Sequence, residues 1–206
     1  MYKKLGYPVE HITHLTTFEA VKTGEWNNKV FLNVGRLTPD KQHLMLLKIW
    51  KQHQSIFENM GWKLIIVGEG EEHETLANYI KENALHNVQL VGATQKIEEY
   101  YSKATCFLFP SRMEGFGMVL LEAMAYGLPC ISFDCPSGPR DIVKDGKNGW
   151  LIPCYDENIF SERMKRLIGM PFEEYCDISK RAMKTVDDWP NGRVMEKWKG
   201  IFESET

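Results

Sequence analysis

Short apolar runs alternate with longer amphipathic segments from Lys29 onward, and this alternation limits the possible folds more than any other feature of the sequence. The apolar runs that we predict to be strands cover residues 30–34, 63–67, 88–91, 106–109, 129–133, 142–143 and 150–152. The predicted helices cover residues 44–60, 71–82, 97–102, 117–126, 159–168, 172–185 and about 191–202. Strands that are almost wholly apolar are buried on both faces, and helical connections between them specify a parallel sheet with right-handed crossovers. The expected fold class is therefore α/β, with a single Rossmann-like, doubly wound parallel sheet.

The composition and charge indicate which classes of partner and which cellular location to expect. With 206 residues, 43% of them hydrophobic, the chain can bury a substantial core. Its 25 Lys and Arg residues against 28 Asp and Glu residues give a net charge of -3, which argues against a general affinity for nucleic acid. We see no apolar run near the roughly 20 residues of a membrane span and no apolar core of a signal peptide. We therefore expect a cytoplasmic protein.

Neither the cysteines nor the histidines are spaced as metal ligands usually are. The five cysteines are widely separated and include no C-x-x-C pair, so neither a disulfide framework nor a zinc site is expected. His11 and His14 are three residues apart, a spacing that suits a helical ligand pair, but no carboxylate or thiol partner accompanies them. We expect no metal site.

The loop after the first predicted strand carries two cations beside a turn glycine, Gly35. This loop matches neither G-x-G-x-x-G nor a Walker sequence, which argues against a dinucleotide site and against a P-loop. Arg36 offers a planar fork for phosphate oxygens and Lys41 a compact point charge, so the pair suits a diphosphate. Two solvated surface charges are the alternative interpretation.

The loop after the fourth predicted strand is the most informative segment. Gly115 and Gly117 allow a tight turn, and a helix that begins near Gly117 leaves unpaired backbone amides, which form an anion site. Glu114 precedes this helix and Glu122 lies within it. A carboxylate beside a phosphate site is best explained if it accepts hydrogen bonds from sugar hydroxyls. The alternative makes Glu114 a partner of the helix dipole and Glu122 a surface residue.

Residues 109–132 resemble the signature of retaining GT-B glycosyltransferases of family 4, in which two glutamates are separated by seven residues. Residues 34–37, with Lys41, resemble the phosphate loop of that family. Residues 64–70 resemble its second strand and turn, and residues 88–92 resemble the strand before its base-binding loop. The resemblance runs from about residue 29 to residue 202, and its motifs occur in the family's order.

The resemblance implies a role for each donor-site residue. Arg36 and Lys41 would hold the diphosphate of a nucleotide sugar, Glu114 the hydroxyls of the transferred sugar, and Glu122 those of the ribose. Catalysis would depend on Glu114, Arg36 and Lys41, without a metal and without a covalent nucleophile, and the anomeric configuration would be retained. The donor-contacting residues would be Gly35, Arg36, Lys41, Gly68, Thr94, Glu114, Gly115, Phe116, Gly117, Met118, Val119 and Glu122, with the amides of residues 117–119 on phosphate oxygens and the backbone near Thr94 on the base.

The loop that follows the strand at 129–133 gives weaker information about the donor. Its Gly138-Pro139 pair is similar to that of enzymes that build bacterial surface polysaccharides, often from UDP-sugars. Arg140 in this loop is either a phosphate ligand or a surface residue. The base, the sugar and the acceptor are not determined by the sequence.

The resemblance also implies a division of the chain. Residues 1–28 would be a lead-in segment, 29–188 the C-terminal, donor-binding half of a GT-B fold, and 189–206 a C-terminal helix. The glycine-rich loop and the histidine of the family's N-terminal acceptor domain have no counterpart before Val30. The chain would then be a fragment, a truncated product or half of a split enzyme, and inactive in transfer by itself. Its acceptor would be a glycan or a lipid-linked sugar bound by the N-terminal domain.

Further expectations concern association and alternative functions. The full enzyme would associate peripherally with the membrane, and the C-terminal helix with Trp198 and Phe202 would be partly unpacked or form a homodimer contact. A catalytically inactive nucleotide-sugar-binding module and a GT-B-type sugar epimerase are the alternatives. A phosphorylase is disfavoured because no lysine is evidently placed for pyridoxal phosphate.

Overall fold

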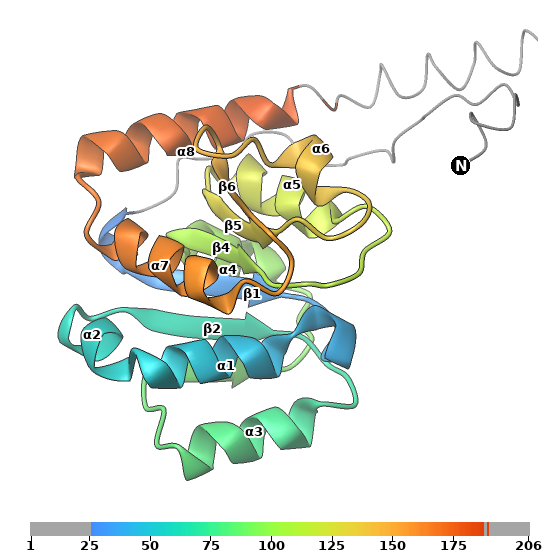
Figure 1. Ribbon diagram of the computed structural model, residues 1–206, viewed down its shortest axis with the longest axis vertical. Coiled ribbons are helices and arrows are strands. Elements are labelled where there is room, and N and C mark those ends of the chain that lie inside the picture. Colours follow the sequence, from blue (N-terminus) through green and yellow to red (C-terminus); the bar gives the residue numbers. More distant parts are fainter. Residues whose placement is uncertain (1–25, 188, 190–206) are drawn as a thin grey trace, which may run out of the picture.

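The structure is a computed structural model that describes residues 26–187 and 189 (Figure 1). In this described part, parallel strands form one six-stranded sheet in the order β3-β2-β1-β4-β5-β6. Its strands are β1 (Val30–Val34), β2 (Lys63–Val67), β3 (Val88–Val91), β4 (Cys106–Phe109), β5 (Cys130–Phe133) and β6 (Gly149–Ile152). Strand order reverses between β1 and β4, so the doubly wound Rossmann-like sheet predicted from the sequence is confirmed.

Helices cover both faces of this sheet. They are α1 (His43–Gln52), α2 (Gln54–Asn59), α3 (His73–Glu82), α4 (Ile97–Lys103), α5 (Met118–Ala125), α6 (Pro139–Ile142), α7 (Glu157–Ile168) and α8 (Phe172–Val186), with 3-10 turns at η2 (Trp26–Asn28) and η3 (Pro39–Lys41). Side chains of α1, α2, α3 and α7 form one core, and those of α4 and α5 form a second. Figure 1 shows α1, α3 and α7 on one side of the sheet and α5 on the other.

The central strands β1, β4 and β5 are buried on both faces, as their sequences predict, whereas no residue of the edge strand β3 is fully buried. In β1, Phe31 belongs to the core with α1, whereas Val30 and Leu32 belong to the core with α5. In β4, Leu108 and Phe107 alternate in the same way. Successive side chains of a strand point to opposite faces, so a strand between two helical layers is mostly apolar. The buried polar residue Asn33 of β1 donates an internal hydrogen bond from Nδ2 to the carbonyl of Leu108 at 2.9 Å.

Two predicted elements differ in the structure. The single helix predicted over 44–60 is divided into α1 and α2 at His53, whose φ of -116° is not helical. The break accompanies a stack of Phe57 on Trp50, with ring centroids 4.3 Å apart. The apolar run 142–143 does not form a strand, because Pro139 occupies the first turn of helix α6 and carries the chain into helical geometry through Ile142. The predicted C-terminal helix over about 191–202 and most of the lead-in segment lie outside the described residues.

Candidate functional site

A cavity of about 830 Å³ lies at the carboxyl ends of β1 and β4, where the strand order reverses. Two loops form most of its wall, the loop after β1 and the loop that joins β4 to α5. The lining residues are Val34, Gly35, Arg36, Thr38, Pro39, Asp40, Lys41, Glu71, Phe109, Arg112, Met113, Glu114, Gly115, Gly117, Met118 and Val119. Ligands of doubly wound sheets bind at this position, beyond the strand ends.

The loop after β1 is fixed by the turn after β2. The amide of Gly35 donates a hydrogen bond to the carbonyl of Val67 (3.0 Å), and that of Leu37 donates to Glu69 (2.8 Å). Gly68 has a φ of +157°, and a Cβ there would lie 1.9 Å from the carbonyl oxygen of Gly35, so this contact requires glycine. The packed turn holds Arg36 at the cavity, with an exposed side chain that has no carboxylate partner among the described residues.

The start of α5 presents backbone amides to the same cavity. Gly117 precedes the helix with a left-handed φ of +85° and makes no side-chain cap. The amides of Met118 and Val119, in the first turn, have no intrahelical acceptor, and both residues line the cavity. The partial positive charge of this helix end therefore faces the cavity and favours an anion.

Lys41 and Glu114 form an ion pair within the cavity wall, between Lys41 Nζ and Glu114 Oε1. Both side chains are largely shielded from solvent, with exposed fractions of 25% and 10%. The family resemblance predicts that these two residues contact different parts of one donor, the diphosphate and the sugar. The structure brings them together and pairs them directly, so that each compensates the charge of the other.

A second ion pair joins the same two loops and was missed in the sequence analysis. The Nε of Arg112 donates to Oδ1 of Asp40 at 2.8 Å, and the amide of Arg112 donates to the carbonyl of Asp40 at 2.9 Å. The hydrogen bond and charge of this carboxylate raise the pKa of the Arg112 guanidinium. Both residues line the cavity. The sequence gives one hint of this pair, because Asp40 is next to Lys41 and Arg112 lies in the loop before Gly115 and Gly117. The two residues are 72 positions apart in the sequence, so the pairing itself could not be predicted.

Glu122 lies on α5 one turn beyond the cavity and is not among the residues that line it. Its Oε2 accepts a hydrogen bond of 2.8 Å from the hydroxyl of Tyr101, a buried residue of α4. Burial raises the pKa of the Glu122 carboxyl, and the hydrogen bond from Tyr101 opposes this shift. The described residues therefore do not place Glu114 and Glu122 in one hollow, and the ribose contact of Glu122 remains a prediction.

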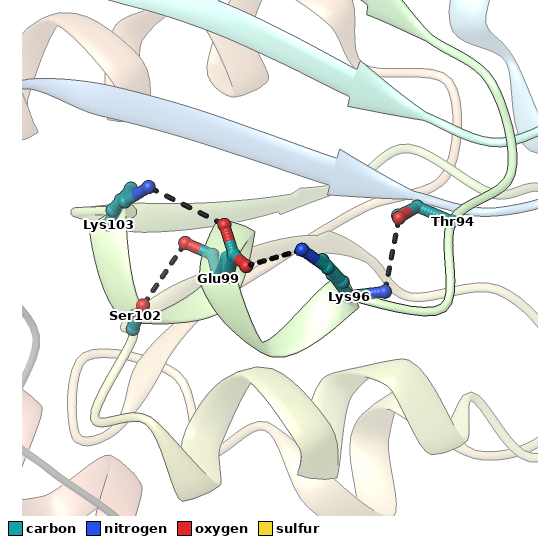
Figure 2. Close-up of polar contacts among 5 residues, drawn as sticks. All are labelled: Thr94, Lys96, Glu99, Ser102 and Lys103. Atoms are coloured by element: carbon teal, nitrogen blue, oxygen red, sulfur yellow. Dashed lines mark hydrogen bonds and ion pairs between the residues drawn. The ribbon is translucent and has the colours of Figure 1, made fainter.

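Thr94 and Gly68 are not among the residues that line the cavity, although Gly68 packs against the lining residue Gly35. The hydroxyl of Thr94 accepts a hydrogen bond from the amide of Lys96 at 3.1 Å and so shapes the turn that enters α4 (Figure 2). This turn is linked to the β2 turn, because the amide of Ala93 donates to Oε1 of Glu69 at 3.3 Å. The base contact near Thr94 remains a prediction.

Phe116 is buried beneath the loop and supports it from outside the cavity. Its ring meets the ring of Trp189 edge to face, with centroids 5.2 Å apart. Gly138, at the start of α6, packs against the same segment, where an added Cβ would lie 1.7 Å from the carbonyl oxygen of Phe116. Arg140, which follows, is paired with Asp134 through two hydrogen bonds of 2.9 and 2.8 Å and does not line the cavity.

Across residues 26–187 and 189, no three His, Cys, Asp or Glu side chains gather in a way that could hold a metal ion. In that same part of the chain, no helix combines the length and the apolar character that crossing a bilayer requires.

Comparison with known proteins gives consistent matches over most of the chain. Residues 17–185 match the family described as glycosyl transferases group 1. The chain is 35% identical over 196 residues to the amylovoran biosynthesis glycosyltransferase AmsD of Erwinia amylovora, covering 95% of this chain and 53% of that protein. The chain thus spans about half the length of this curated relative.

Two solved structures share the fold. That of S. aureus TarM in complex with fondaparinux, alpha-GlcNAc-glycerol and UDP superimposes with a TM-score of 0.86 at 24% identity, over 97% of this chain and 41% of TarM. The pneumococcal O-GlcNAc transferase GtfA in complex with UDP and GlcNAc superimposes with a TM-score of 0.78 at 26% identity, over 91% and 38%.

Proposed function

The chain belongs to the glycosyl transferases group 1 family, and we propose that it binds a UDP-sugar in the cavity between β1 and β4 as the donor half of a retaining glycosyltransferase. The observation that carries this proposal is the convergence of Arg36, Lys41 and the N-terminal end of α5 on one cavity. UDP in the structures of TarM and GtfA supports the choice of base.

The diphosphate is the part of the donor that this cavity suits best. Arg36 has no carboxylate partner among the described residues, and its planar guanidinium can bind two phosphate oxygens. The first amides of α5 supply further hydrogen bonds on the opposite wall. As the bond to the sugar breaks, negative charge develops on the leaving diphosphate, and these preorganised positive groups stabilise it.

Glu114 then serves the transferred sugar. Its carboxylate is held by Lys41 at the edge of the phosphate region, where a sugar attached to the second phosphate would lie. Donor binding divides this ion pair, with Lys41 moving to a phosphate oxygen and Glu114 accepting hydrogen bonds from sugar hydroxyls. Glu122 and the turns at Gly68 and Thr94 complete the nucleoside region as ribose and base contacts.

Transfer itself needs an acceptor site facing this cavity. We propose that an acceptor domain, of the kind found in full-length family members, supplies it, and that the acceptor is a glycan or lipid-linked sugar of a surface polysaccharide. The relative AmsD, named as an amylovoran biosynthesis glycosyltransferase, supports this class of acceptor.

Calorimetric titration of the chain with UDP, uridine and a panel of UDP-, GDP- and ADP-sugars tests the donor. We expect UDP and a UDP-sugar to bind more tightly than the other nucleotides. The variant Arg36→Ala should weaken UDP by roughly 1.5–3 kcal/mol, the usual range for hydrogen bonds to charged groups, and leave uridine almost unchanged.

The matched control is Lys48→Ala, which removes an exposed cation of α1 that does not line the cavity. Equal losses for UDP and uridine in Arg36→Ala would make Arg36 a structural residue and not a phosphate ligand. Glu122→Ala tests the ribose contact in the same titration, and unchanged UDP affinity in that variant would remove Glu122 from the site.

A further inference from the structure

A second cavity, of about 180 Å³, lies between the last two turns of α8 and the segment that joins α6 to β6. We name it the α8 basic cavity. Its lining residues are Lys144, Lys147, Asn148, Arg181, Lys184 and Thr185. The charged residues among them are all cations, and no lining residue is shared with the cavity at β1 and β4. It is therefore a separate site with a different charge.

The floor of the α8 basic cavity is a buried hydrogen-bond network. Asn148 is 2% exposed, and its Nδ2 donates to Oγ1 of Thr185 at 2.8 Å and to the carbonyl of Ile142 at 2.9 Å. Its Oδ1 accepts from the amide of Lys144 at 2.7 Å. Of these hydrogen bonds, the one to Thr185 joins the loop to α8, and the other two close the loop on itself.

Arg181 is held in place by the same segment. Its Nε donates to the carbonyl of Lys147 at 2.7 Å, which orients the guanidinium and anchors the lysine backbone. An arginine that is fixed through Nε keeps its two terminal nitrogens for another acceptor. The cavity thus combines one oriented guanidinium with lysine ammonium groups, of which that of Lys144 donates to the carbonyl of Arg140 at 3.1 Å.

The four cations have no carboxylate to compensate them among the described residues. None of them takes part in the ion pairs of this part of the chain. The nearest acid in sequence, Asp145, turns its Oδ1 to the amide of Leu151 at 3.1 Å. Arg181 and Lys184 also lie near the end of α8, where cations favour the helix dipole, but this explains neither Lys144 nor Lys147.

We propose that the α8 basic cavity binds a phosphate group. Four cations converge there in a chain whose net charge is -3, and a phosphate offers the matching acceptors for an oriented guanidinium and two or more ammonium groups. At about 180 Å³ the cavity admits a phosphate or a pyrophosphate but is much smaller than the 830 Å³ donor cavity. The phosphate comes either from a soluble anion or from the headgroup of an anionic phospholipid.

Two arms of one experiment distinguish these sources. In the first, inorganic pyrophosphate is titrated into the chain with UDP present to occupy the donor cavity. In the second, the chain is sedimented with phosphatidylcholine vesicles that contain or lack phosphatidic acid. The test variant is Lys147→Gln with Lys184→Gln, and the control is Lys48→Gln with Lys81→Gln, which changes the net charge equally on exposed residues of α1 and α3.

We expect the test variant to lose affinity in one arm while the control keeps it. For vesicles the expected loss is about 25-fold, from roughly fivefold for each basic residue near an anionic surface. Loss confined to pyrophosphate assigns a soluble phosphate, and loss confined to vesicles assigns the lipid headgroup. Equal binding by test and control variants in both arms, or no binding of either probe by the unmodified chain, overturns the proposal.

Thermal unfolding and UDP titration accompany both arms. The test variant should keep the UDP affinity of the unmodified chain, because the two cavities share no residue. If the double variant unfolds early, Lys184→Gln alone is measured against Lys48→Gln alone, since Lys184 makes no side-chain hydrogen bond in the described structure.

Discussion

Arg112 is joined to Asp40 twice, through a side-chain hydrogen bond of 2.8 Å and a backbone hydrogen bond of 2.9 Å. The adjacent residue Lys41 is paired with Glu114 in the same two loops. These neighbouring cross-links connect the loop after β1, which carries Arg36, to the loop before α5. The position of one wall of the donor cavity therefore depends on the other.

The Arg112–Asp40 pair should position the donor site and contribute little to the stability of the fold. Asp40→Asn weakens the charge interaction and keeps a side-chain acceptor of similar shape, so we expect UDP-sugar affinity to fall several-fold while the melting temperature changes little. The control is Glu174→Gln, which acts on the exposed pair Arg166–Glu174 outside the cavity wall. Equal donor affinities of the two variants in calorimetry would show that the pair does not position the loops.

Glu122 should make stability depend on pH in a predictable direction. Burial raises its folded-state pKa above the usual 4.5, so the stability linked to its protonation is complete below pH 4.5 and is lost as pH rises through the folded-state value. Glu122→Gln removes this charge and keeps an acceptor for the Tyr101 hydroxyl. We expect the variant to gain stability relative to the unmodified chain at pH 7, and the gain to vanish below pH 4.5.

Urea unfolding at several pH values measures this difference. Glu162→Gln, on the exposed surface of α7, is the control for removal of one carboxylate. A constant difference between Glu122→Gln and the unmodified chain from pH 4 to pH 7 would contradict the expected effect of burial.

His43 should cause a loss of stability in acid. The residue is fully buried at the start of α1, neither ring nitrogen has a hydrogen-bond partner among the described residues, and burial together with Lys41 lowers its pKa from 6.5 to about 4. Above pH 6.5 the imidazole is neutral in both the folded and the unfolded state, and the stability linked to its neutral form is complete. As pH falls toward 4, the unfolded state binds a proton that the folded state does not, and this stability is lost. At about 1.4 kcal/mol per pKa unit, the loss is on the order of 3 kcal/mol.

The variant His43→Leu should flatten the fall of unfolding free energy between pH 6.5 and pH 4. Denaturant titrations of this variant and of His73→Leu, an exposed histidine of α3, provide the comparison. If His43→Leu keeps the full acid dependence, other groups are responsible for it.

Gly138 should be required for the shape of the donor loop. In Gly138→Ala the new Cβ would lie 1.7 Å from the Phe116 carbonyl oxygen at a φ of +100°, so the backbone of one loop must move. We expect a loss of roughly 1–3 kcal/mol in stability from the strained backbone, together with weaker UDP binding. Gly146→Ala is the control, because its φ is +69° but its Cβ would enter open space. If Gly138→Ala and Gly146→Ala lose the same amount of unfolding free energy and both keep the UDP affinity of the unmodified chain, the contact of Gly138 with Phe116 is not needed.

The sequence by itself determined the fold and the edge of the sheet at which the large cavity lies. The β strands are short and mostly apolar, and such segments have few ways to be buried other than between two layers of helices. The cations Arg36 and Lys41 lie in the loop after β1, and Gly115 and Gly117 lie in the loop after β4. Both loops leave the carboxyl edge of one parallel sheet, which must bring them together. These are local patterns, and local patterns are readable without a structure.

The tertiary structure decided which side chains meet. The pairing of Lys41 with Glu114 and of Arg112 with Asp40 joins residues 73 and 72 positions apart. The hydrogen bond of Glu122 to Tyr101 and the convergence of four cations beside α8 likewise depend on how separate elements pack. Charge interactions act between neighbours in space, and neither the direction of a long side chain nor its closest partner is encoded in spacing along the chain.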